Sequence, residues 1–198
     1  MGATITWDGN GDGTTYEDGG NWGGTVPTND LSTDVAQFIG GTVDLSTTRQ
    51  VSGLHYASAT TLSGTGSLEI GDDGILVAGD SWLSTEGVVF NQPNTTITLA
   101  GGRLSWGPSA VVSGTGAVTV TGGDVLYVDG TANTYEGGTT ITGGARVSFR
   151  GDINAVGGLG TGDIIIDNGI LTNNDANQSI FARNIEIGAG GATMYTLQ

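Results

Sequence analysis

The chain contains an internal repeat, and a repeat restricts the possible folds more than any single motif does. A Ser-Gly-Thr-Gly pattern followed by alternating apolar residues begins at Ser63 and returns at Ser113, 50 positions later. A third copy begins at Gly160 without the serine. The branched apolar residues two and four positions after the second glycine are Leu68 and Ile70, Val118 and Val120, and Ile164 and Ile166. This alternation predicts short β-strands with one buried face.

A companion repeat lies between these copies, because residues 96–106 resemble residues 140–149. Each period of 46 to 50 residues therefore holds about two coils of roughly 20 to 25 residues, the size of one solenoid coil. We predict an all-β fold, a right-handed single-stranded parallel β-helix (β-solenoid) of about seven rungs. Trp106 occupies the position of Phe149 and is expected in the core. An antiparallel β-sandwich stays open as an alternative, because the number of strands does not separate the two folds.

Composition agrees with short strands joined by tight turns. The 198 residues include 38 glycines and only 3 prolines, and the apolar residues come in short runs rich in Val, Ile and Leu. The net charge is −15, with five arginines and no lysine. Nucleic acid is therefore not an expected partner, because phosphate binding depends on clustered Lys and Arg. No run of apolar residues is long enough for a membrane span, so we expect no membrane insertion by this segment.

The sequence divides into two parts. Residues 1–40 form an aromatic and acidic N-terminal cap segment, and residues 41–198 carry the solenoid repeats as one continuous domain. Trp7, Tyr16 and Trp22 lie in the first part. They have two interpretations: a plug that closes the open end of the solenoid core, or an exposed platform on which sugars stack.

Residues 133–144, followed by residues 158–171, resemble the autotransporter-associated β-strand repeat of bacterial passenger domains. The resemblance lies in an aromatic-x-Gly-Gly-Thr entry at Tyr135 and a Leu-Gly-x-Gly exit at Leu159. It covers about residues 133–172, with weaker similarity over residues 62–128. The resemblance implies an extracellular or cell-surface β-helical stalk, structural or adhesive, without catalytic residues. Because the ends of a solenoid are open strand edges, end-to-end self-association into fibres is also expected.

One loop has the spacing of calcium ligands. Asp8, Asn10 and Asp12 follow the D-x-N-x-D-G pattern, with Asp18 as a fourth candidate ligand, so Ca²⁺ is the one cofactor to consider. The twelfth position, where an EF-hand carries a bidentate glutamate, is Gly19, and Glu17 is out of step. A polar turn held by Asp and Asn side chains is the alternative.

Other functions rest on weaker signals. Trp82 is the best candidate for an exposed aromatic ligand residue, so a module that binds surface glycans is an alternative function. Thr-x-Thr pairs begin at Thr4, Thr96, Thr119 and Thr140 and would suit an ice-binding ladder, although threonine is also an ordinary strand residue. A polysaccharide lyase or hydrolase is the least favoured function, because the carboxylates lie mainly in turns and His55 is the only histidine.

Overall fold

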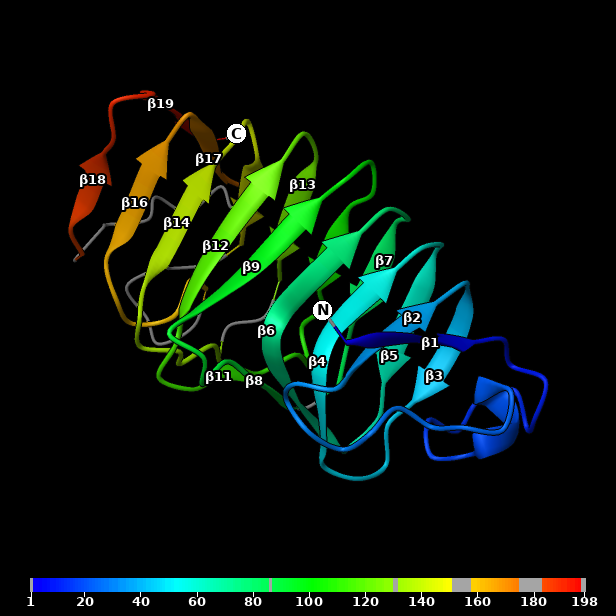
Figure 1. Ribbon diagram of the computed structural model, residues 1–198. Coiled ribbons are helices and arrows are strands. Elements are labelled where there is room, and N and C mark those ends of the chain that lie inside the picture. The colour runs from blue at the N-terminus through cyan, green and yellow to red at the C-terminus, as the bar shows by residue number, and fades with distance from the viewer. Residues whose placement is uncertain (1, 86, 130–131, 151–157, 175–182, 197–198) are drawn as a thin grey trace.

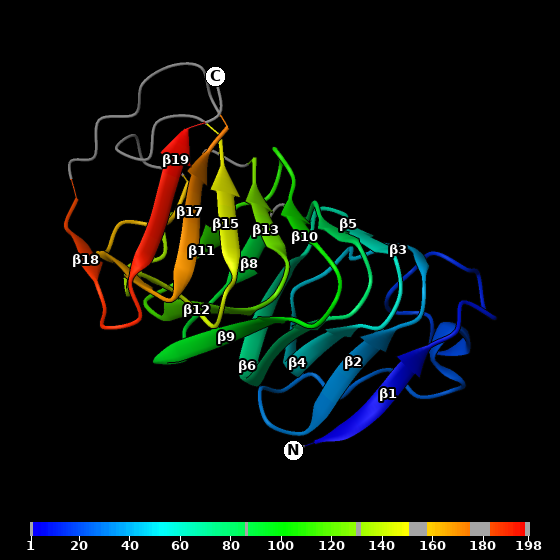
Figure 2. The same cartoon turned by 90° about the horizontal axis from the view of Figure 1, so that it is seen from above.

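The computed structural model describes residues 2–85, 87–129, 132–150, 158–174 and 183–196. Its strands form two sheets, and every pairing between named strands is parallel (Figure 1). The two sheets face each other along the molecule, and the chain passes from one to the other in each coil (Figure 2). The predicted all-β parallel β-solenoid is confirmed.

The strands of the first sheet are, in spatial order, β1 (Ala3–Trp7), β2 (Asp34–Phe38), β4 (Arg49–Tyr56), β6 (Ser67–Val77), β9 (Asn94–Leu99), β12 (Ala117–Gly122), β14 (Thr139–Thr142), β16 (Ile164–Asp167) and β18 (Ile185–Ile187), with β8 (Gly87–Val89) and β11 (Val112–Ser113) branching from β6. Those of the second sheet are β3 (Gly41–Asp44), β5 (Thr60–Ser63), β7 (Ser81–Leu83), β10 (Leu104–Trp106), β13 (Val125–Val128), β15 (Arg146–Phe149), β17 (Gly169–Asn173) and β19 (Ala192–Thr196). The eight strands of the second sheet are close to the seven or so rungs expected. A short 3-10 helix, η1 (Gly19–Trp22), lies beyond the N-terminal end of the sheets (Figure 1).

The core consists of apolar columns in which equivalent residues of successive coils stack. One column of the first sheet contains Ile75, Ile97, Val120, Ile141, Ile166 and Ile187. Successive members are 21 to 25 residues apart, which confirms the predicted coil length. In the second sheet, Trp106 and Phe149 both align with Val128 and are buried, so the companion repeat marks equivalent core positions as expected.

The three copies of the Gly-Thr-Gly repeat are not all equivalent in space. Val118 and Ile164, from the second and third copies, both align with Thr139. Leu68, from the first copy, instead aligns with Val88, while Ile75 is the residue of β6 in the column of Val120. The long strands β4 and β6 cover a part of the coil that later coils divide between two shorter strands.

A tight corner explains why the motif recurs at different places around the coil. Gly64 and Gly114 have φ angles of 113° and 111°. A Cβ on either residue would collide with a carbonyl oxygen of the preceding coil, that of Leu45 or Phe90. The motif therefore marks a corner that only glycine fits, whichever strands flank it.

The boundary predicted at residue 40 does not coincide with the start of the sheets. β1 and β2 lie within residues 1–40, yet they already belong to the first sheet. The segment between them extends past the N-terminal end of the core (Figure 1). In the part of the chain that the structure describes, no helix is long and apolar enough to cross a membrane.

Candidate functional site

An aromatic cluster closes the N-terminal end of the core. The ring of Trp22 lies edge-on to Trp7 and Tyr16, with centroids 5.2 and 4.9 Å away, and 5.6 Å from Phe38. The indole N–H of Trp22 donates a 2.6 Å hydrogen bond to the carbonyl of Tyr16. Trp7, Tyr16 and Trp22 are 2%, 0% and 3% exposed. The plug interpretation is confirmed, and the sugar platform is wrong for these three residues because their faces are buried.

The loop with calcium-like spacing lies just outside this cluster. Asp8 Oδ1 accepts the amide of Asn10 at 3.0 Å, and Asp8 Oδ2 accepts the Asn10 side-chain amide at 2.8 Å. Asp18 accepts the amides of Asp12 and Gly20 at 2.8 and 2.9 Å, so it also caps η1. The structure thus joins Asp8 to Asn10 and Asp12 to Asp18.

Asp12 is the centre of the loop's hydrogen bonds. Its Oδ1 atom accepts the amides of Thr14 and Thr15 at 2.9 and 2.8 Å and the side chain of Asn21 at 2.8 Å. Hydrogen bonds from Thr15, Thr14 and Asn21 hold the pKa of Asp12 far below its usual range. Asn21 Oδ1 in turn accepts the amides of Gly11 and Gly13. These contacts are those of a polar turn, and the calcium site stays a prediction.

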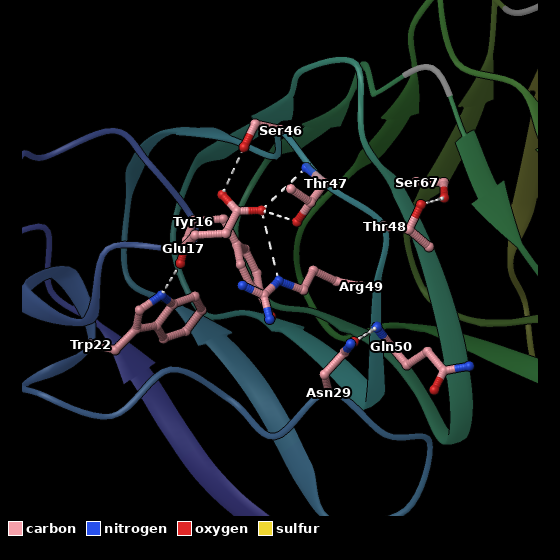
Figure 3. A network of polar contacts seen from close by, with 10 residues as sticks. All are labelled: Tyr16, Glu17, Trp22, Asn29, Ser46, Thr47, Thr48, Arg49, Gln50 and Ser67. Carbon is pink, nitrogen blue, oxygen red and sulfur yellow. Dashed lines mark hydrogen bonds and ion pairs between the residues drawn. The ribbon is translucent and has the colours of Figure 1, made fainter.

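A second set of contacts fastens the cap to the solenoid, and we call it the clasp: Glu17, Ser46, Thr47 and Arg49 (Figure 3). Glu17 Oε1 accepts the Thr47 hydroxyl at 2.6 Å and the Thr47 amide at 3.2 Å, and Oε2 accepts the Ser46 hydroxyl at 3.2 Å. Arg49 Nε lies 3.7 Å from Glu17 Oε1. The Arg49 guanidinium also lies 5.9 Å from the centre of the Tyr16 ring.

The clasp carboxylate is electrostatically stabilised. Partial burial alone would raise the pKa of Glu17, but the hydrogen bonds from Thr47 and Ser46 and the charge of Arg49 outweigh it, so the pKa is lowered. Burial raises the pKa of the neighbouring Tyr16 hydroxyl. No sequence pattern predicts the clasp, since Glu17 and Arg49 are 32 positions apart and only the stacking of the cap on the first coils brings them together.

The C-terminal end of the described solenoid has no comparable cover. β18 and β19 form the last strands of the two sheets. Ile187 and Met194 continue core columns through Ile166 and Leu171, which are 0% and 2% exposed. Ile187 and Met194 themselves are 52% and 44% exposed. Two core columns therefore end in contact with solvent.

The outer face of the first sheet carries part of the threonine ladder. Thr96 aligns with Thr119, which aligns with Thr140. A parallel row pairs Thr98 with Thr121. Thr4 and Thr6 lie apart, aligned with Val35 and Gln37. The ladder thus spans three coils, with Ile165 in the next position beyond Thr140, and ice binding stays a prediction.

His55, the only histidine in the sequence, also lies on this face and belongs to a row of side chains joined by hydrogen bonds. Gln37 Nε2 lies 2.8 Å from His55 Nδ1, and the Thr6 hydroxyl donates to Gln37 Oε1 at 2.8 Å. Burial lowers the pKa of His55. His55 and Asp73 line a depression of about 160 Å³. Among the described residues, no group of three or more His, Cys, Asp or Glu side chains could hold a metal ion.

Trp82 lies on the outer face of the second sheet and is 43% exposed, as the sequence suggested for this residue. It aligns with Ser105 in the next coil, and Ser105 aligns with Tyr127. Sequence reasoning did not single out Tyr127, because only the register of three coils places it in line with Trp82. Asp80 and Arg103 form an ion pair beside this column, with Arg103 Nη2 and Asp80 Oδ2 2.7 Å apart.

Comparison of the chain with models of protein families, with curated proteins and with solved structures finds no match. The autotransporter resemblance therefore stays a prediction made from the residues alone.

Proposed function

We propose that this chain is a structural or adhesive β-solenoid module of an extracellular or cell-surface protein, and that it performs no catalysis of its own. The parallel solenoid fold and the repeat resemblance support this role. Continuous stacking of coils gives a stiff body whose stability comes from nearest-neighbour contacts, which suits a stalk or spacer.

The difference between the two ends is the observation that carries the proposal. Trp7, Tyr16 and Trp22 seal the N-terminal end, whereas Ile187 and Met194 leave two core columns exposed at the other. Terminal strands of a solenoid also present unpaired backbone groups to any strand that can align with them. The C-terminal end is thus the natural place for the module to join another solenoid coil.

We take a second copy of the chain as the partner, joined through the same end. Residues 14–16 already bond to Asp44 at the edge of β3, through the Asp44 amide to Thr14 and the Tyr16 amide to Asp44. The N-terminal segment is also acidic, with seven Asp and Glu and no Arg before residue 49. A pair joined through two C-terminal ends involves neither the covered edge of β3 nor the acidic N-terminal segment. A two-fold axis closes such a pair. The expected product is a dimer rather than the fibre that two open ends would give.

Sedimentation across a concentration series tests this association. The unmodified chain is expected to form a dimer at high concentration, and Ile187→Lys combined with Met194→Lys is expected to abolish it, because two charges would be buried at the joint. Ile165→Lys is the matched control, since Ile165 is 36% exposed on the outer face of the neighbouring strand β16. A monomer at every concentration, or a dimer that survives the double change, would contradict the proposal.

The proposed location has its own test. Antibody labelling of intact source cells, compared with permeabilised cells, is expected to give equal signals if the protein lies at the surface. Label that requires permeabilisation, together with absence from the medium, would contradict an extracellular role.

A further inference from the structure

The outer face of the second sheet carries two aromatic residues in one column. Trp82 and Tyr127 both align with Ser105, so they lie two strands apart, a separation of roughly 9 to 10 Å. Trp82 is 43% exposed, and Tyr127 is half-buried. The residue between them in the column, Ser105, has a small side chain. The line joining the rings runs across the strands, along the length of the solenoid.

A fixed pair of charges lies beside the two rings. Asp80 Oδ1 accepts the backbone amide of Arg103 at 2.9 Å, and Asp80 Oδ2 accepts Arg103 Nε at 2.9 Å, in addition to the ion pair. The Arg103 guanidinium also lies near enough to Tyr127 for the two side chains to interact electrostatically. Asp80 and Arg103 remain 44% and 46% exposed at their side chains. Arg103 is therefore bound to the coil of Trp82 and lies near Tyr127, while both charged side chains are nearly half exposed.

A single exposed aromatic residue is common on protein surfaces and needs no explanation. Two features distinguish Trp82 from such an isolated aromatic residue. The second ring is in register with it, and the charged pair between the coils is held by three contacts rather than left free. Indole and phenol rings have an apolar face and a polar edge, which suits ligands that have both kinds of surface.

We propose that Trp82 and Tyr127 form a binding surface for a linear, neutral polysaccharide that lies along the solenoid axis. Two sugar rings stack their C–H faces on the two aromatic rings, and Asp80 and Arg103 exchange hydrogen bonds with the sugar hydroxyls. The ligand is neutral because a net charge of −15 without lysine repels polyanions such as pectate. In the second sheet, β15 and β17 separate β13 from the last strand β19, so this surface does not depend on the proposed dimer.

Isothermal titration tests the surface with cellohexaose and chitohexaose as neutral probes and oligogalacturonate as the anionic probe. We expect at least one neutral hexasaccharide to bind, its disaccharide to bind at least tenfold more weakly because it cannot cover both rings, and oligogalacturonate not to bind. Trp82→Ala and Tyr127→Ala are each expected to weaken hexasaccharide binding at least tenfold. Arg103→Gln should weaken it less, because the rings remain.

Ile165→Ala is the control on the outer face of the other sheet, and it should bind as the unmodified chain does. Thermal unfolding of each variant verifies that the solenoid is intact. The proposal is overturned if neither neutral probe binds, if only oligogalacturonate binds, or if binding survives the loss of both aromatic rings.

Discussion

The two ends of the described solenoid differ in whether the last residues of the core columns are covered. At the N-terminal end, the columns of the core finish under Trp7, Tyr16 and Trp22, and the clasp fastens this cover to the coil beneath (Figure 3). At the C-terminal end, Ile187 and Met194 finish their columns half exposed. A coil is stabilised mainly by its neighbours, so the last coil at an uncovered end lacks one of its two interfaces. In the described solenoid, aromatic side chains thus cover the core at the N-terminal end, whereas the columns that finish at Ile187 and Met194 are about half exposed.

Charge reinforces this difference. Seven carboxylates precede the first arginine at residue 49, whereas the described residues 183–194 carry only Arg183 and Glu186. Repulsion between two acidic caps acts against contact through the N-terminal ends. Residues 183–194, with one charge of each sign, carry no such excess of negative charge.

The largest expected effect comes from removing the centre of the cap. Trp22→Ala deletes a 3% exposed ring that contacts three other aromatic residues, and such changes cost about 3–5 kcal/mol. Urea unfolding followed by circular dichroism measures the loss. Trp82→Ala is the control, because a 43% exposed tryptophan should change stability by no more than about 0.5 kcal/mol. A loss for Trp22→Ala as small as the one expected for Trp82→Ala would mean that the cap does not stabilise the solenoid.

A second comparison truncates an aliphatic side chain in the buried part of a core column and another at the exposed end of the same column. Leu54 is 1% exposed and belongs to the column that continues through Ile75 to Ile187. Leu54→Ala should cost about 2–5 kcal/mol, as for other buried large-to-small changes. Ile187→Ala should cost less than about 1 kcal/mol in the monomer, because half of that side chain is already in water. A large cost at Ile187 in dilute, monomeric protein would show that the C-terminal end is covered after all.

The features that sequence predicted are those repeated in every coil. Alternation after each Gly-Thr-Gly corner identified Leu68, Val118 and Ile164 as buried, and all three are. The companion repeat placed Trp106 in the core correctly. Periodic signals work here because each coil meets the same stacking constraint.

The features that sequence missed depend on contacts between particular coils. The first Gly-Thr-Gly copy looked equivalent to the second, but a corner motif does not record where around the coil the corner lies. Glu17 meets Thr47 and Arg49 only after the cap folds onto the first coils. Tyr127 joins Trp82 only through the register of β7, β10 and β13. To predict these contacts, the number of residues in each coil must be known, and the repeat gives that number only approximately.

A smaller effect is expected from the clasp. Glu17→Gln removes the charge that accepts three hydrogen bonds and faces Arg49, which should cost about 1–2 kcal/mol in cap stability. Hydrogen exchange of the amides of residues 14–17 and 47 measures opening of the cap. Glu136→Gln, at an exposed position far from the cap, should leave this exchange unchanged.

Acidification should act on the same contact. The folded pKa of Glu17 lies below its ordinary value of 4.5, so its contribution to stability is complete above pH 4.5 and is lost as the pH falls through the folded pKa. Cap opening should therefore increase below about pH 4.5. Part of this pH dependence should persist in Glu17→Gln, because Asp12 and Asp30 also have lowered pKa values. The same pH dependence in Glu17→Gln and in the unmodified chain would rule out the clasp as a source of cap stability.

The smallest effect concerns calcium at the cap. Asp8, Asp12 and Asp18 already accept hydrogen bonds from the loop itself, so a bound ion would have to replace those contacts. We expect millimolar Ca²⁺ to leave the unfolding midpoint unchanged relative to the same concentration of Mg²⁺ at equal ionic strength. A calcium-specific rise that disappears in Asp12→Asn would establish the calcium site that the D-x-N-x-D-G spacing suggests. That result would also change the comparison of the two ends, since the closed end would then depend on an ion as well as on aromatic packing.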